Sequence, residues 1–178
     1  MKITKTKLEG VFILQTKQFK DPRGWFSESY NKKNFKAVTT TSFVQDNVSF
    51  NKKKFTFRGL HFQTRPFQQS KLIRVDQGAI VDVVLDLRVK SKTYLKMITV
   101  KLDDQNQKQL FIPKGLAHGF LTLTPNTKVF YKVDQFYSPK HDKGINVLDP
   151  QIKIPGFNKM QFHLSNKDKQ LPFLHESY

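Results

Sequence analysis

The clearest strand signal in this sequence is the run Ile80-Val81-Asp82-Val83-Val84-Leu85-Asp86-Leu87. In a β-strand, alternate side chains point to opposite faces, so the valines and leucines at odd-numbered positions would share one face. Asp82 and Asp86 would lie on the other face, beside Ile80 and Val84. The β-branched residues of the run also favour a strand over a helix.

Further strand-like runs, separated by turn residues, are spread along the chain. They are Val11–Leu14, Ser42–Phe50, Phe55–Gln63, Leu72–Val75, Ala79–Leu87, Leu95–Leu102, Gln109–Ile112, His118–Leu123 and Val129–Gln135. Helical periodicity is poor until Ser165, which together with Asp168 forms a capping-box-like helix start. Many short strands and little helix predict an all-β fold, as a sandwich, jelly roll or small barrel. Because no repeat, linker or composition break appears, we expect a single domain over residues 1–178.

Composition excludes several classes of protein. The chain has 178 residues and no cysteine, so disulfides, zinc–thiolate sites, iron–sulfur clusters and thiol nucleophiles are ruled out. No apolar run approaches the roughly 20 residues of a membrane helix. The segment Met1–Lys5 lacks the features of a signal peptide, so we expect a cytoplasmic protein. The formal net charge of +17 favours an anionic partner, which nucleic acid, a membrane surface or a small substrate would each satisfy.

Two histidines, His61 and His118, lie beside glycine in strand-like runs. Each could be a core residue with satisfied ring nitrogens. A cupin-type metal site would need another ligand close by, often a histidine two residues further on. Here Gln63 stands at that position after His61 and no His-x-His occurs, so we expect no metal.

Acid–base chemistry on an anionic substrate is the other interpretation of these residues. Arg23, Arg58 and Lys71 stand among apolar or turn residues rather than in charged runs. A guanidinium suits bidentate phosphate recognition, and a lysine suits an oxyanion. Tyr131, in a strand-like run, could donate a proton or could be an ordinary core aromatic.

A set of motifs, weak singly but specific in their order and spacing, covers nearly the whole chain. They are Asp21–Tyr30, Phe43–Asn47, Arg58–Gln63, Lys71–Leu72, Gly78–Arg88, Ile112–Phe120, Tyr131–Lys132, Tyr137–Pro139 and Leu164–Asp168. Through them the sequence resembles the dTDP-4-dehydrorhamnose 3,5-epimerase family. The resemblance implies a cupin-type jelly roll (double-stranded β-helix), here with short C-terminal helical segments, that acts as a homodimer without cofactor or metal.

The resemblance also implies a reaction. The substrate would be dTDP-4-keto-6-deoxy-D-glucose, epimerised at C3 and C5 through an enolate on the route to dTDP-L-rhamnose. His61 would be the base, Asp168 would orient it, and Tyr131 would be the acid on the opposite ring face. Lys71, helped by His118, would hold the C4 oxygen. The diphosphate of this substrate would account for Arg23 and Arg58, so we expect no nucleic-acid and no membrane partner.

The remaining residues matched to the family would contact substrate: Arg23, Glu28, Gln45, Asn47, Arg58, Tyr137, Asp142 and Lys167. Tyr137 would stack on thymine, and the segment with Arg23 and Glu28 would reach across from the partner subunit. Strict alternation puts Arg58 and His61 on opposite strand faces, although both are assigned to one cavity. We therefore expect an irregularity at Gly59, where glycine permits a bulge.

Three departures from the family's usual pattern affect the C-terminal third. Asp142 stands where the family usually has Glu, Val147 where it has the Trp of Trp-Asn-Asp, and Ile154 where it has the Trp of Trp-Pro. We expect them to alter nucleotide and sugar specificity more than reaction type. Two alternatives stay open: an epimerase of C3 or C5 alone, and a non-catalytic or metal-dependent cupin that binds carbohydrate or nucleotide.

Overall fold

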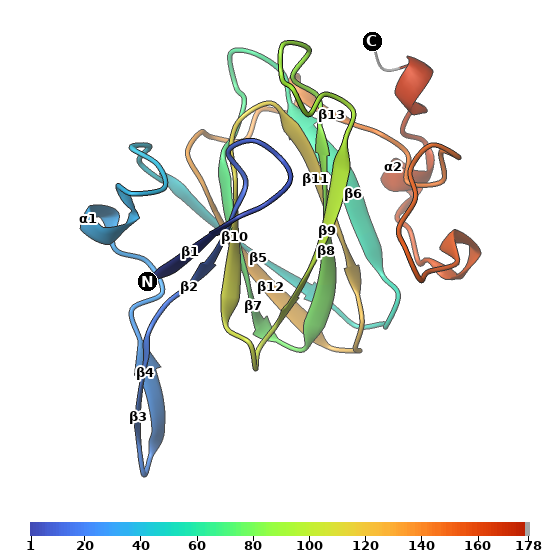
Figure 1. Cartoon of the computed structure of the whole chain (residues 1–178). Helices are drawn as coiled ribbons and strands as arrows, with labels where there is room; N and C mark the ends of the chain where they lie inside the picture. Colours follow the sequence, from blue (N-terminus) through green and yellow to red (C-terminus); the bar gives the residue numbers. More distant parts are fainter. Residues whose placement is uncertain (177–178) are drawn as a thin grey trace.

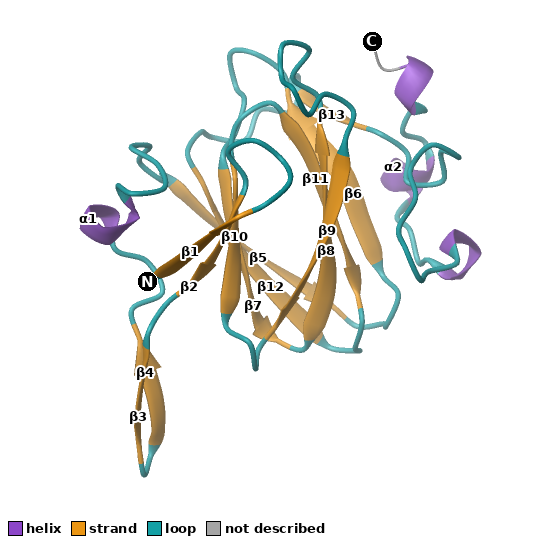
Figure 2. Cartoon of the chain, in the orientation of Figure 1, coloured by secondary structure: helices purple, strands orange, loops and turns teal. Residues whose placement is uncertain are grey.

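The computed structural model describes residues 1–176, which form two antiparallel sheets that face each other (Figures 1 and 2). The first sheet has the strand order β1 (Lys2–Lys5), β2 (Phe12–Gln15), β10 (Lys108–Ile112), β7 (Lys71–Gln77), β12 (Thr127–Val133) and β5 (Gln45–Asn51). The second has the order β13 (Asp142–Gly144), β6 (Phe57–Gln63), β11 (Leu116–Thr122), β8 (Ala79–Asp86) and β9 (Met97–Asp103). This is the all-β, cupin-type jelly roll that the sequence predicted.

The main core lies between the two sheets. Ile73 and Val129 of the first sheet meet Ile80, Val84 and Phe120 of the second in one buried cluster. Removing such side chains from water supplies roughly 25 cal/mol for each Å² of apolar surface, which holds the sheets together. The predicted division of β8 is confirmed, because its even-numbered residues face this core.

A second cluster covers the outer face of the second sheet. Val83 and Leu85 of β8 pack there against the C-terminal segment, which contributes Ile145 and Leu174. That segment, orange to red in Figure 1, includes η1 (Lys159–Gln161), α2 (Asn166–Lys169) and η2 (Leu174–Glu176). Ser165 is the N-cap of α2, as predicted, and its side chain accepts a hydrogen bond from the backbone N–H of Asp168.

The segment before the main strands stands apart from the two sheets. β3 (Gln18–Asp21) and β4 (Gly24–Ser27) form a hairpin that projects away from them (Figure 1). After it, α1 (Lys32–Phe35) begins at the N-cap Asn31 and buries Phe35 against Leu72 and Phe111. This contact anchors the segment on the outer face of the first sheet.

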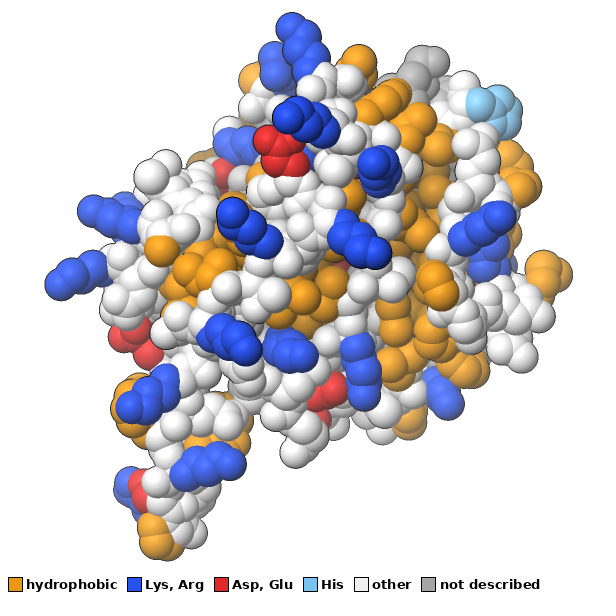
Figure 3. Space-filling view, in the orientation of Figure 1, with side chains coloured by type: hydrophobic (Ala, Val, Ile, Leu, Met, Phe, Trp, Pro, Cys, Tyr) orange, Lys and Arg blue, Asp and Glu red, His pale blue; other side chains and the backbone are white. Residues whose placement is uncertain are grey.

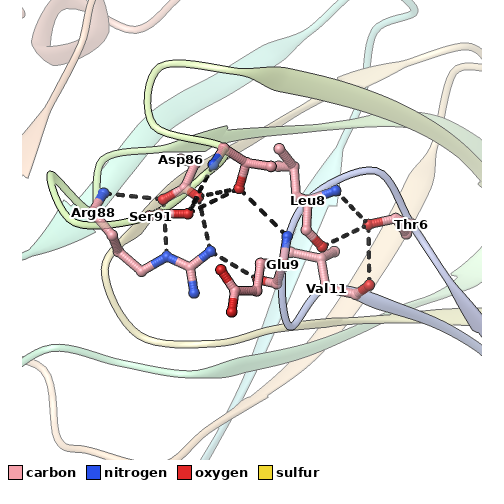
Figure 4. Close-up of polar contacts among 8 residues, drawn as sticks. Thr6, Leu8, Glu9, Val11, Asp86, Arg88 and Ser91 are labelled. Carbon is pink, nitrogen blue, oxygen red and sulfur yellow. Dashed lines mark hydrogen bonds and ion pairs between the residues drawn. The ribbon is translucent and has the colours of Figure 1, made fainter.

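A buried carboxylate ties the N-terminal loop to the end of β8 (Figure 4). Asp86 accepts hydrogen bonds from Arg88, from the Ser91 hydroxyl at 2.7 Å and from the Thr93 hydroxyl at 2.6 Å. Arg88 also donates to the carbonyl of Glu9 at 2.8 Å. Burial opposes ionisation of Asp86, but these hydrogen bonds outweigh it and lower the pKa of the carboxyl well below its usual range.

Each strand-like run predicted from the sequence corresponds to an observed strand, within a few residues at its ends. The prediction missed β1, β3, β4, β13 and α1. All of these are only three or four residues long, and β1 is exposed along its whole length. Within residues 1–176, no helix is long and apolar enough to span a membrane.

Candidate active site

A cavity of about 480 Å³ is bounded by residues of both sheets and of the C-terminal segment. It brings together all the predicted site residues except two. Those lining it are Gln45, Asn47, Arg58, His61, Lys71, His118, Tyr131, Tyr137, Asp142, Lys167 and Asp168. Arg23 and Glu28 do not line it.

Gly59 explains how neighbouring positions of β6 reach one cavity. His61 pairs with His118 and Arg58 with Phe120, so two residues of β6 lie opposite the single residue Gly119 of β11. Gly59 has a φ of +122°, and a Cβ at this position would lie 2.5 Å from the Cα of Gly119. The predicted irregularity is confirmed, and it brings Arg58 and His61 to the same cavity.

His61 is paired with a buried carboxylate. Its Nε2 lies 2.7 Å from Oδ1 of Asp168, whose side chain is only 4% exposed. The carboxylate is presented by the short helix α2, which Ser165 caps. A carboxylate on one ring nitrogen fixes the tautomer of the imidazole and stabilises the imidazolium once it forms.

A buried lysine lies next to the backbone of His61. Lys71, at the start of β7, is buried, and its ammonium lies 3.4 Å from the carbonyl oxygen of His61. Burial lowers the pKa of Lys71 to about 8, although the charges of Asp82 and Asp142 act in the opposite direction. The lysine is therefore charged at neutral pH but close to titrating.

The second histidine has its own carboxylate. Nε2 of His118 lies 2.6 Å from Oδ1 of Asp82, which is fully buried on β8. Burial lowers the pKa of His118 more than Asp82 raises it. Among the described residues, Oδ2 of Asp82 has no hydrogen-bond partner. Asp82 was assigned no role in the site from the sequence, although the alternation of β8 had placed it on the face that turns out to be the inner one.

Tyr131 lines the cavity from the sheet opposite to that of His61. It is on β12 of the first sheet, whereas His61 is on β6 of the second, so the phenol and the imidazole belong to opposite sheets. Burial raises the pKa of Tyr131, against a smaller opposing effect of Arg58, which keeps the phenol protonated at neutral pH. The phenol can therefore act as a proton donor.

A polar trio borders the cavity further out. The Tyr137 hydroxyl donates to Oδ2 of Asp142 at 2.9 Å, and the Lys167 ammonium donates to the same oxygen. The hydrogen bond with Asp142 raises the pKa of both Tyr137 and Lys167. Tyr137 is 54% exposed, so its ring is open to a ligand.

The remaining polar lining comes from β5 and β6. Gln45 and Asn47 share one face of β5 and are joined by a hydrogen bond of 2.9 Å. Nε of Arg58 donates to Asn51 at 2.6 Å, which ties β6 to β5 across the two sheets. The guanidinium therefore has a fixed position beside the cavity.

The hairpin keeps Arg23 and Glu28 away from their own cavity. Arg23 is at the hairpin tip, has a side chain that is 89% exposed, and pairs with Asp21. Glu28 accepts hydrogen bonds from Asn31 and Asn34. Neither can contact a ligand bound in the cavity of the same chain.

The structure also adds lining residues that no motif had singled out as site residues. They are Ser49, Phe62, Gln63, Gln69, Phe120 and Ser165. Alternation along β5 would have grouped Ser49 with Gln45 and Asn47, but the loop position of Gln69 gives no such signal. Within residues 1–176, no group of three His, Cys, Asp or Glu side chains is arranged to hold a metal ion.

The family model of dTDP-4-dehydrorhamnose 3,5-epimerase matches residues 5–176. The chain belongs to the dTDP-4-dehydrorhamnose 3,5-epimerase family. The resemblance seen in the sequence is thereby confirmed, and with it the expectation of an isomerase. Among curated members of the family, the protein of Sinorhizobium fredii is 44% identical over 167 residues, covering 93% of this chain and 86% of its own.

Solved structures of the epimerase family agree with this assignment. The dTDP-4-dehydrorhamnose 3,5-epimerase of Bacillus anthracis, with TDP and pyrophosphate bound, has a TM-score of 0.94 and 47% identity. The match covers 97% of this chain and 99% of that one. The dTDP-6-deoxy-D-glucose-3,5-epimerase of Legionella pneumophila, in complex with dTDP-4-keto-L-rhamnose, has a TM-score of 0.91 and 36% identity. That match covers 98% of this chain and 93% of the other.

The positions that depart from the usual epimerase pattern fall in two places. Asp142 lines the cavity, so a change there can affect substrate recognition. Val147 and Ile154 are instead buried in the cluster between the second sheet and the C-terminal segment. Their side chains serve packing and do not line the cavity, so an effect on specificity would have to be indirect, and the expected change in specificity stays a prediction.

Proposed function

We propose that this chain epimerises dTDP-4-keto-6-deoxy-D-glucose at C3 and C5 through an enolate, without a cofactor, on the route to dTDP-L-rhamnose. One observation carries the proposal: a histidine–carboxylate pair and a tyrosine occupy opposite walls of one cavity, with a buried lysine beside them. A module that only binds sugar has no need for a base and an opposed acid.

The electrophilic part of the site is Lys71 with His118. The hydrogens at C3 and C5 both flank the C4 ketone, so removal of either one leaves negative charge on the C4 oxygen. A buried ammonium placed at that oxygen stabilises the enolate more than it would in water. The same burial disfavours the charged ammonium, and it lowers the pKa of Lys71 to about 8.

His61 is the proposed base. Because Nε2 is held by Asp168, Nδ1 is the ring nitrogen that would take the proton from carbon. Asp168 then stabilises the imidazolium that results. Histidine is the side chain that most often serves as a general base near neutral pH.

Tyr131 is the proposed acid. Inversion at a carbon requires that the new proton arrive on the ring face opposite to the one from which the first was removed. Tyr131 and His61 project from opposite sheets, which supports this division of roles. The phenol is buried and its pKa is raised, so it is protonated when the enolate forms.

The nucleotide end would bind at the outer part of the cavity. Tyr137 is open to stack on thymine, while Arg58 and Lys167 supply positive charge for the diphosphate. Gln45, Asn47 and Asp142 would complete the polar contacts. The net charge of +17, visible as basic side chains scattered over the surface in Figure 3, draws such an anion from solution.

The functional unit would be a cytoplasmic homodimer of one domain, residues 1–178. The hairpin exposes Phe19, Trp25 and Phe26, which are 53%, 50% and 70% exposed. Val48 and Phe50, on the outer face of β5, are also exposed. A second copy would cover these apolar side chains, and its Arg23 and Glu28 would then complete the cavity of the first.

Incubation of the protein with dTDP-4-keto-6-deoxy-D-glucose in deuterated water tests the proposal. Proton NMR should show deuterium entering at C3 and C5, with inversion at both centres. Exchange at one carbon alone would indicate a single-centre epimerase. No exchange at either carbon would support a non-catalytic or metal-dependent binding module instead.

A further inference from the structure

Gln63 uses its whole amide to hold the rim of the cavity. It is at the end of β6, two residues after His61, and is 5% exposed. Its Nε2 donates to the carbonyls of Phe67, at 2.6 Å, and Phe136, at 3.2 Å. Its Oε1 accepts from the backbone N–H of Ser138 at 2.6 Å.

Two of these partners, Phe136 and Ser138, flank Tyr137 in the chain. The carbonyl of Phe136 and the N–H of Ser138 are the backbone groups immediately before and after it, and one side chain binds both. The N–H of Tyr137 itself donates to Oε1 of Gln45 at 3.2 Å. Because β5 and β6 belong to different sheets, the two glutamines fix the backbone of Tyr137 between the walls of the cavity.

The geometry points to Gln63 as a positioning residue for the nucleotide end of the substrate, acting through Tyr137. This inference rests on the function proposed above. The Tyr137 hydroxyl donates to Asp142, and the residue is more than half exposed. Its placement therefore depends on the backbone that Gln63 holds, and a buried amide with all these bonds made is costly to disturb.

Gln63→Met is the variant that tests this inference, because it keeps the length of the side chain and removes its hydrogen bonds. Competitive inhibition constants should be measured with dTDP and with inorganic pyrophosphate, together with KM and kcat for the sugar nucleotide. We expect the dTDP constant and KM to rise about tenfold, while the pyrophosphate constant changes by less than about twofold. The ratio of deuterium exchange to inversion should not change.

A second background separates positioning from general damage. In Tyr137→Ala, which already lacks the ring, adding Gln63→Met should raise the dTDP constant no further. Gln63→Glu keeps the acceptor but loses the donors to Phe67 and Phe136, so it should weaken dTDP binding even if the methionine variant folds poorly. Gln107→Met is the matched control. Its amide donates to the carbonyl of Asp104. Asp104 in turn accepts a hydrogen bond from the N–H of Gly78, just beyond the end of β7 that is remote from Lys71.

The outcomes are distinct. If the wild-type protein neither binds dTDP nor turns over the sugar nucleotide, the proposed function is wrong. If it does both and Gln63→Met has an unchanged dTDP constant, only the role of Gln63 is wrong. Equal weakening of dTDP and pyrophosphate, or a further tenfold loss in the Tyr137→Ala background, would likewise overturn the inference.

Discussion

Lys71 should make the reaction sensitive to alkaline pH. With a pKa of about 8, roughly nine-tenths of the free enzyme carries the ammonium at pH 7 and roughly one-tenth at pH 9. Because only the charged form stabilises the enolate oxygen, kcat/KM should fall about tenfold between these pH values. The alkaline limb of kcat should lie at higher pH, since the bound diphosphate favours the charged lysine.

Two variants test whether Lys71 is the group whose titration lowers activity at alkaline pH. Lys71→Arg retains a charge that does not titrate in this range, so its lower activity should no longer fall near pH 8. Lys71→Met should lose about 10²–10³-fold in kcat and also lose the limb. The assay is initial-rate epimerisation, coupled or followed by NMR, from about pH 6 to about pH 10. The assignment would be refuted if the limb near pH 8 persisted in Lys71→Arg, because another group would then have to titrate.

Three further predictions concern Asp168, Asp86 and the net charge of the protein. Asp168→Asn should lower kcat about 10²–10⁴-fold while the far-ultraviolet circular dichroism stays unchanged, because it disturbs the His61 tautomer without deleting the base; equal rates would contradict the pairing. Asp86→Asn should lower the free energy of unfolding by roughly 2–4 kcal/mol at neutral pH. Asp86 has a folded-state pKa below its unfolded value of about 3.9, so its stabilisation is complete above that pH and disappears as pH falls further. The free energies of unfolding of the wild-type protein and of Asp86→Asn, measured by denaturant titration, should therefore converge at acid pH. Finally, kcat/KM should fall several-fold when the salt concentration is raised from about 20 to about 200 mM. Salt screens the attraction between the cationic protein and the diphosphate of the substrate. An unchanged kcat/KM would mean that the net charge does not steer the substrate.

The interior strands were predictable because burial leaves a periodic trace in the sequence. In β8 the two faces meet different apolar clusters, so alternation separated them correctly. The missed elements lack that trace. β13 is the three-residue segment Asp142–Gly144 and forms through backbone pairing with β6, and α1 depends on the packing of Phe35.

The site was predictable as a set of residues but not as an arrangement. Motifs identified most of the lining side chains but not, for example, Ser49 and Gln69, and strand parity correctly required the bulge at Gly59. Asp82 and Gln63 act through hydrogen bonds to groups far away in sequence, which no local pattern encodes. Val147 departs from the family pattern near the site motifs, yet it is buried in the cluster beneath the C-terminal segment, which the sequence alone did not indicate.

The central claim is that His61 and Tyr131 act on opposite ring faces. Its most direct test is the ratio of deuterium exchange to inversion at C3 and C5 in Tyr131→Phe, compared with the wild-type protein. The base remains in this variant, so exchange should continue, while inversion falls by about 10²–10⁴-fold. His61→Ala, as the reference, should abolish both. If exchange and inversion in Tyr131→Phe fall by the same factor, Tyr131 is not the opposite-face acid, and the account of the cavity walls is contradicted.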